Sequence, residues 1–316
     1  MDLFSREHRG AIACRLVVIV AGVVLLVAQG PWHEAAWPVH AGRAALVALA
    51  VNQLSLVLTA TRFHRVLAAN DLPTRWPAIF AIHLQSMFYF FFVPMTVGLE
   101  LSRFAKLKRL HPRATNTALG ATILLDRFVG VAGALVFTAL SLPWIALNEH
   151  SAVTLGWQRA LFIVGGGVVG LGVLLAWPRA RRPIVEAWRV VAPNYHRLGP
   201  AAVLTALSQA AFAYAVQQSA AAFGIEVGFA ATLFAVSASM LFIVLPVSFA
   251  GAGPSEAACA ALFAMLGLPA REALIASGLV YGLRLVAALQ GAGVEIVGDL
   301  RSLHRLAPTQ KIHEHG

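Results

Sequence analysis

Two arginines inside apolar segments are the residues of this sequence best placed to do chemistry. Arg127 lies about twelve residues into one long apolar segment, and Arg284 lies about eleven into another. At about 1.5 Å per helical residue, each would reach the middle of a hydrocarbon layer about 30 Å thick. An arginine at that depth costs about 2.5 kcal/mol or more, so it is expected to face a partner or a water-filled cavity.

Three carboxylates are available to these arginines. Glu100 and Glu256 each follow a proline and one or two glycines, and Asp126 directly precedes Arg127. Adjacent helical positions do not face each other, so Asp126 cannot simply neutralise Arg127. We expect Glu100, Glu256 and Asp126 to partner the two arginines around a polar cavity. The alternative is a set of static ion pairs that only support the structure.

The composition indicates the elements that must position these residues. The chain has 316 residues, of which 59% are hydrophobic and 12% charged, and its mean hydropathy is +0.75. Soluble domains carry about 25% charged residues. Apolar runs near twenty residues recur, so we predict an all-α polytopic membrane protein, with residues 1–316 forming a single transmembrane domain. Cys14 and Cys259 lie in apolar surroundings and are interpreted as small core residues, not as metal ligands or a disulfide.

Lysines and arginines predict the topology. Six spans are expected, the first ending near 28 and the others at about 42–61, 115–147, 159–177, 200–223 and 273–297. With both termini inside, 19 of the 24 Lys and Arg lie on the cytoplasmic side, including Arg62 in the loop after the second span. The net charge of +10 is attributed to these loops and not to nucleic-acid binding.

Two further apolar segments, about 77–97 and 229–266, have both flanks on one side of the membrane. We therefore predict that each is a re-entrant hairpin, which is tolerated where protein or a water-filled cavity covers the irregular backbone. The residues predicted to break the two hairpins are Pro94, Gly98, Pro246, Gly251 and Gly253.

The predicted order of helix, helix, hairpin and helix occurs twice, at about 11–147 and about 158–298. Three spans per unit is an odd number, so the second unit must be inverted relative to the first. Inverted repeats with broken helices near the midplane are a recurrent transporter architecture, with the substrate site at the repeat interface.

These motifs resemble the flippase-type transmembrane domain of lysylphosphatidylglycerol synthases and its stand-alone relatives, which include dolichol-phosphate-glucose-synthase-like and hopanoid-associated proteins. The first family motif, a proline, a Gly-Gly-acid group and an arginine, is matched by Pro94, Gly98, Glu100 and Arg103. The second, a proline followed by Gly-x-Gly-x-x-Glu, is matched by Pro246, Gly251, Gly253 and Glu256. Leu99 and Ser255 depart from the family pattern, where a second glycine and a basic residue are common.

The resemblance implies translocation of a lipid between leaflets of the cytoplasmic (inner) membrane. The lipid would be an anionic phospholipid, a polyprenyl-phosphate-linked lipid or a hopanoid. The residues expected to line its path are Arg127, Arg284, Asp126, Glu100, Glu256 and Arg103. The soluble aminoacyl-transferase domain of the synthases is not in this sequence, so we expect no enzyme activity and no cofactor. Expected partners are the lipid itself and either further copies of the chain or enzymes of lipid biosynthesis.

Two other functions stay open at this point. A secondary transporter of a soluble solute fits the repeats equally well, with Glu100, Asp126 and Glu256 as proton sites. An integral-membrane glycosyltransferase would need a group of carboxylates in a loop, usually with a metal, and the loops hold only scattered acids. No histidines have metal-ligand spacing, and His83 is interpreted as a packed polar residue.

Overall fold

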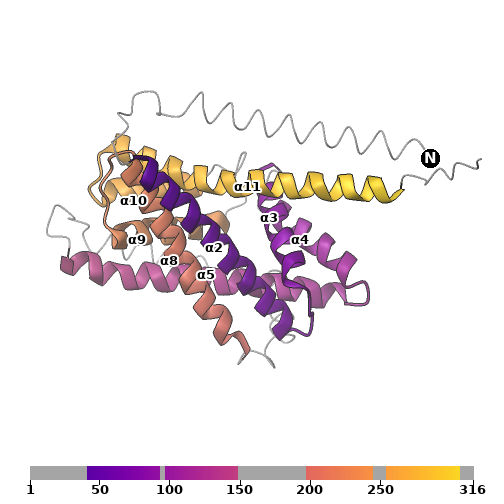
Figure 1. Cartoon of the computed structure of the whole chain (residues 1–316). Helices are drawn as coiled ribbons and strands as arrows, with labels where there is room; N and C mark the ends of the chain where they lie inside the picture. Colours follow the sequence, from indigo (N-terminus) through magenta and orange to yellow (C-terminus); the bar gives the residue numbers. More distant parts are fainter. Residues whose placement is uncertain (1–40, 93–96, 149–196, 245–253, 307–316) are drawn as a thin grey trace, which may run out of the picture.

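The computed structural model describes residues 41–92, 97–148, 197–244 and 254–306, and every regular element in these ranges is a helix (Figure 1). The elements are α2 (Ala41–Ala69), α3 (Trp76–Phe92), α4 (Val97–Leu110), α5 (Asn116–Asn148), α8 (Gly199–Ala222), α9 (Phe229–Met240), the short 3-10 helix η3 (Leu241–Val244), α10 (Pro254–Met265) and α11 (Ala270–Leu306).

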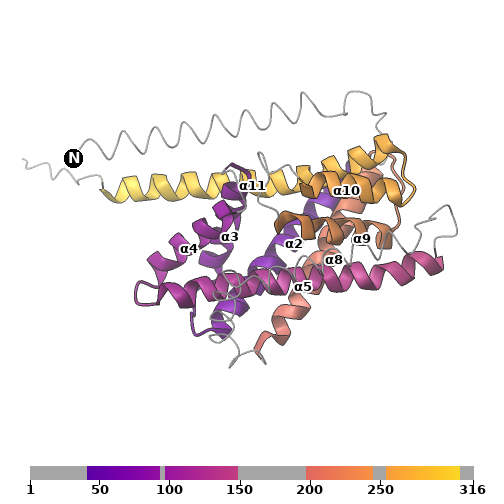
Figure 2. The ribbon, with the colours of Figure 1, turned by 180° about the vertical axis from the view of Figure 1, so that it is seen from behind.

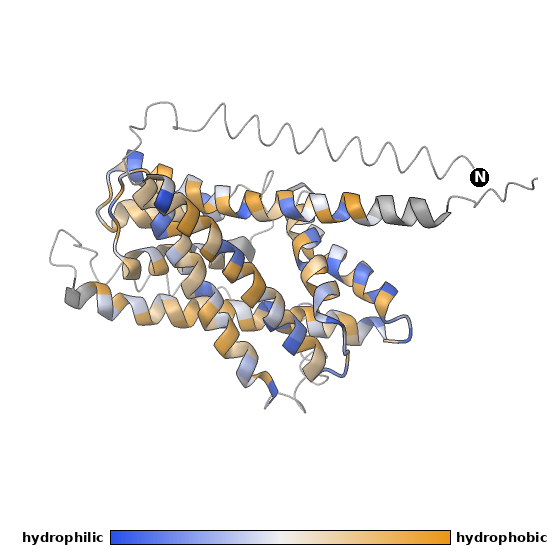
Figure 3. Cartoon of the chain, in the orientation of Figure 1, coloured by the Kyte–Doolittle hydropathy of each residue, from blue (hydrophilic) through white to orange (hydrophobic). Residues whose placement is uncertain are grey.

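Four of these helices, α2, α5, α8 and α11, are long and apolar enough to cross a membrane. Large apolar side chains stand exposed on their outer surfaces, for example Leu46, Leu140 and Leu274. Figure 3 shows hydrophobic residues along most of these helices, whereas hydrophilic residues gather in α4 and in the turn that follows it. The apolar outer surface suits contact with lipid, and the chain is a multi-pass, all-helical membrane protein within the described residues.

Two pairs of shorter helices separate the long ones. The pair α3 and α4 lies between α2 and α5, and the pair α9 and α10 lies between α8 and α11. Of the predicted break residues, Pro94, Pro246, Gly251 and Gly253 lie outside the described residues. Gly98 lies in the first turn of α4 and is buried.

The packing of the helices is reciprocal between the two halves of the chain. Helix α2 runs along α8, α3 packs against α11, and α9 packs against α5. The views in Figures 1 and 2 agree that α5 and α11 lie on opposite sides of the molecule, with α2 and α8 crossing between them. The first short helix of each pair therefore packs on the last long helix of the other half.

Local sequence signals account for several helix ends. The Thr115 hydroxyl oxygen accepts a hydrogen bond from the backbone N–H of Ala118 at 3.2 Å, which caps the start of α5. Gly224 and Gly267 follow α8 and α10 with φ of 72° and 95°, a conformation that glycine adopts without steric cost. In α4, Glu100 lies in the first turn and basic residues in the last, the arrangement that the helix dipole favours.

Helix α2 is longer than the sequence predicts, and this corrects the position of Arg62. The sequence places Arg62 in a cytoplasmic loop, whereas the structure continues α2 to Ala69 and buries the side chain. Phe63, Val66 and Leu67 are fully buried in this extension. Their spacing along the chain is that of one face of a helix, which explains why the helix continues.

Candidate functional site

A cavity of about 250 Å³ lies at the centre of the described residues. Side chains from seven helices line it: α2, α3, α4, α5, α8, α9 and α11. Four of its lining residues are arginines (Arg62, Arg103, Arg127 and Arg284), and two are acids (Glu100 and Asp126). A charged cavity among membrane-spanning helices is costly and marks a functional site by default.

Two buried arginines of the cavity meet at Asp126. Arg62 donates from Nε to Asp126 Oδ1 at 2.8 Å and from Nη2 to Oδ2 at 3.1 Å, a two-point ion pair. Arg103 donates from Nη1 to the same Oδ2 at 3.2 Å. Asp126 is 1% exposed, Arg62 8% and Arg103 5%. Two arginines thus share one carboxylate away from solvent.

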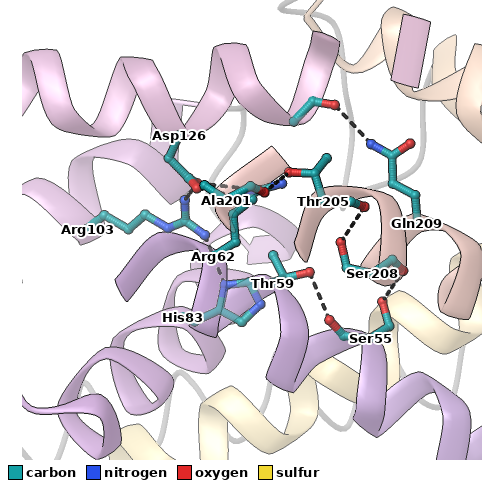
Figure 4. Close-up of polar contacts among 11 residues, drawn as sticks. Ser55, Thr59, Arg62, His83, Arg103, Asp126, Ala201, Thr205, Ser208 and Gln209 are labelled. Carbon is teal, nitrogen blue, oxygen red and sulfur yellow. Dashed lines mark hydrogen bonds and ion pairs between the residues drawn. The ribbon is translucent and has the colours of Figure 1, made fainter. Parts of the chain in front are cut away.

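His83 completes this group, which we call the Asp126 cluster: Arg62, His83, Arg103 and Asp126. Figure 4 shows the four side chains converging, and each comes from a different helix, α2 to α5 in turn. Arg103 Nη2 lies 3.0 Å from His83 Nδ1. A guanidinium can only donate, so Nδ1 must accept, and the ring proton is on Nε2. His83 is therefore neutral in this arrangement.

Two further ion pairs join the other arginines to carboxylates of the short helices. Arg127 Nη1 on α5 pairs with Glu100 Oε1 on α4. Arg284 Nη1 on α11 pairs with Glu256 Oε1 on α10 at 2.8 Å and lies 3.4 Å from the Ser255 hydroxyl. In each half of the chain, a long-helix arginine therefore pairs with a carboxylate in the first turn of the second short helix.

A row of polar groups continues the cavity wall between α2, α5 and α8 (Figure 4). The Ser55 hydroxyl donates to the carbonyl of Ser208 at 2.9 Å, and Gln209 Nε2 donates to the carbonyl of Gly130 at 3.0 Å. The remaining wall is mostly apolar and includes Leu56, Met87, Phe90, Leu99, Val131, Phe212, Met240 and Leu283. The cavity therefore offers both charged and apolar surface to a ligand.

Several buried polar atoms of the lining residues have no hydrogen-bond partner among the residues that the structure describes. They are His83 Nε2, Glu100 Oε2, Arg103 Nε, Gln209 Oε1 and Arg284 Nη2. Leaving such an atom unpaired costs about 1–3 kcal/mol. Each of these five atoms belongs to a residue that lines the cavity.

The α4 helix is also tied to α11 beside the cavity. Lys106 Nζ donates to Glu295 Oε2 at 2.7 Å, and the Tyr89 hydroxyl donates to Glu295 Oε1 at 2.9 Å. Lys106 and Tyr89 both belong to the first pair of short helices. These contacts hold that pair against the last long helix.

The predicted site residues come together as pairs and clusters, and their role in a substrate path stays a prediction. Arg127 with Glu100, Arg284 with Glu256, and Asp126 with Arg103 are brought together. Asp126 was expected to partner Arg127 or Arg284 and pairs instead with Arg62 and Arg103, whose side chains reach it from α2 and α4. Sequence reasoning missed Arg62 in the site and treated His83 as an isolated packed residue. Of the two departures from the family motif, Leu99 lines the cavity and Ser255 contacts Arg284.

Comparison with known families agrees with the motifs. The sequence model of the lysylphosphatidylglycerol synthase TM region matches residues 12–291. Comparisons with curated proteins and with solved structures found no match. A function related to membrane lipids follows from the family match. The chain belongs to the family of the lysylphosphatidylglycerol synthase TM region.

Proposed function

We propose that this protein moves a lipid between the two leaflets of the cytoplasmic membrane through the central cavity. The observation that carries the proposal is the cavity itself, which combines four arginines with a largely apolar wall. A soluble solute would have little use for the apolar wall, whereas a lipid has both a polar headgroup and apolar chains. The family supports a lipid-related role for this cavity.

The architecture that we propose is an inverted repeat with both termini in the cytoplasm. The reciprocal packing of α3 on α11 and α9 on α5 supports it, because a two-fold axis between two equivalent units would exchange these contacts. The matching pairs Arg127–Glu100 and Arg284–Glu256 support it as well. In this architecture α3 with α4, and α9 with α10, are the two re-entrant hairpins, which enter from opposite sides of the membrane.

In the proposed mechanism the headgroup passes through the cavity while the acyl chains stay in the surrounding lipid. The arginines and their carboxylates replace the water that the headgroup loses on entry, which lowers the barrier that the hydrocarbon layer presents. No covalent bond forms or breaks, so we propose that the protein is a transporter and not an enzyme. The lipid would be an anionic phospholipid, a polyprenyl-phosphate-linked lipid or a hopanoid.

The proposal is tested with purified protein in liposomes that carry fluorescent lipids. Dithionite reduces only the fluorophores that reach the outer leaflet, so translocation appears as bleaching beyond the outer-leaflet fraction. We expect this extra bleaching with the native protein and its loss in Arg127→Gln and Glu256→Gln variants that remain folded. Liposomes with native protein that bleach like empty liposomes, across anionic, polyprenyl-phosphate and neutral lipids, would contradict the proposal.

A further inference from the structure

Most large apolar side chains of the cavity wall also pack in the hydrophobic core. The core clusters of the described residues include Leu56, Met87, Phe90, Phe212, Met240 and Leu283. Leu99 and Val131 line the cavity as well, but they belong to none of the apolar clusters that the described residues form. The place of these two side chains in the wall is therefore separate from the packing of the core.

Leu99 lies in the first turn of α4, beside the charged residues of that helix. Residues four apart share one face of a helix, so Leu99 lies on the face from which Arg103 reaches Asp126. The next residue, Glu100, pairs with Arg127 of α5. A polar group that approaches the charges on α4 would therefore lie against Leu99.

Val131 stands in a similar position on α5. It follows Arg127 by four residues and shares its face of the helix. Leu99 and Val131 are thus each one helical turn from an arginine that lines the cavity. The two side chains narrow the space around these arginines from two helices, and leucine is the larger of the two.

The helix that carries Leu99 is held in place. Arg103 is tied to Asp126 of α5 at 3.2 Å, and Lys106 to Glu295 of α11 at 2.7 Å. Leu107, near the end of α4, is fully buried in an apolar cluster with residues of α2, α3 and α5. Because closely packed elements yield little, α4 should not move aside for a large group that enters the cavity.

We infer that Leu99, together with Val131, limits the size of the lipid headgroup that the cavity accepts. This inference rests on the proposed function, which it narrows: lipids with small headgroups are moved in preference to lipids with large ones. The cavity volume of about 250 Å³ is below the range of roughly 300–1,000 Å³ that is typical of ligand pockets. In so small a space a few carbon atoms of the wall matter, since a single methylene can change selection about tenfold or more.

The variant that tests this inference is Leu99→Ala, and its matched control is Leu101→Ala. Both substitutions remove the same isopropyl group from α4, so the change in helix propensity is the same. Leu101 is 62% exposed and is not among the described residues that line the cavity. Neither substitution changes a charge. A difference between the two variants therefore reports the space in the cavity.

The liposome assay compares phosphatidylglycerol with phosphatidylinositol, each with its fluorophore on an acyl chain. The two lipids have the same phosphate and the same charge, so the ratio of their rates reports headgroup size. We expect native protein and Leu101→Ala to move phosphatidylglycerol about tenfold faster or more. This ratio should fall severalfold in Leu99→Ala and by a smaller factor in Val131→Ala, which serves as a second variant. Equal rates of the two lipids with native protein, or the native ratio in both cavity variants, would overturn the inference.

Thermal unfolding in detergent separates this inference from the proposed function. A ligand that binds the folded protein raises its unfolding temperature. If native protein moved neither lipid, the proposed function would be overturned, and short-chain forms of both lipids would still test the size limit. A larger shift by phosphatidylinositol in Leu99→Ala than in native protein and Leu101→Ala would uphold it, whereas equal shifts in all three would overturn it. Equal shifts by inositol phosphate without acyl chains would overturn the lipid assignment.

Discussion

Gly291 of α11 lies so close to α3 that a Cβ atom at this position would overlap the carbonyl oxygen of Leu84. Only a glycine allows the two helix backbones this approach, a device common between membrane helices. Gly291→Ala should therefore push α3 away from α11 and cost about 1–3 kcal/mol of stability, as overpacking does. Thermal unfolding in detergent measures the loss.

The matched control for this prediction is Gly293→Ala on the same helix. A Cβ there would meet no atom within 4 Å. Because alanine favours a helix over glycine by up to about 1 kcal/mol, Gly293→Ala should leave stability unchanged or raise it. Equal unfolding temperatures for the two variants would contradict the close contact.

His83 should stabilise the folded protein by accepting a hydrogen bond from Arg103. His83→Leu leaves the Nη2 donor of Arg103 without its present partner, and His83→Gln restores a carbonyl oxygen that can accept. We expect His83→Leu to cost about 1–3 kcal/mol, and His83→Gln to cost less. Thermal unfolding of both variants tests this, and a leucine variant as stable as the glutamine variant would rule out the hydrogen bond.

The two pairs between long and short helices should differ in strength. The side chains of Arg284 and Glu256 are 7% and 15% exposed, against 28% and 24% for Arg127 and Glu100. Water weakens the more exposed pair, so the coupling energy should be larger for Arg284 with Glu256, within a range of about 0.5–3 kcal/mol.

A double-mutant cycle with Arg→Gln and Glu→Gln at each pair measures these coupling energies. Each single variant gives the change in the free energy of unfolding when one side chain is replaced. The double variant shows how far the two changes depart from additivity, and that departure is the coupling energy of the pair. A coupling energy near zero at both pairs would mean that neither ion pair forms in the folded protein.

The contacts of Glu295 should hold the α3 and α4 pair in place. Glu295→Gln leaves the Lys106 ammonium without its carboxylate, and we expect a loss of about 1–3 kcal/mol. Adding Lys106→Met removes the second charge and should recover part of that loss. If the double variant unfolded at a lower temperature than Glu295→Gln alone, the two residues would not be acting as a pair.

Much of the helical layout could be predicted from the sequence because it depends on hydropathy. The long helices α5, α8 and α11 lie close to the predicted spans, and α3, α9 and α10 fall inside the two predicted hairpin segments. Helix α4 lies beyond the first segment, where the sequence predicts a basic cytoplasmic flank. An apolar run of membrane-spanning length has few alternatives to a helix, since lipid supplies no hydrogen bonds to the backbone. The inversion of the repeats and the topology stay predictions.

The Asp126 cluster could be predicted only in part, because it depends on which helices meet. Arg103 and Asp126 stood out as charges near apolar segments, and both are in the site. Arg62 did not stand out, because a basic residue just after a span is typical of a cytoplasmic loop. Arg62 belongs to the site because α2 continues to Ala69, beyond the end of the predicted span. His83 carried no signal of its own, since its partner is on another helix.

The central claim is that a lipid moves through the cavity. The most direct test is to fill the cavity with a larger side chain without changing any charge. Ala134 lines the cavity and is 1% exposed, whereas Val136 on the same helix is 54% exposed on the outer surface. Ala134→Phe and Val136→Phe are compared with native protein in the liposome bleaching assay, after both are shown to remain folded. We predict that Ala134→Phe slows translocation strongly and that Val136→Phe does not. Native rates with Ala134→Phe would contradict lipid movement through this cavity.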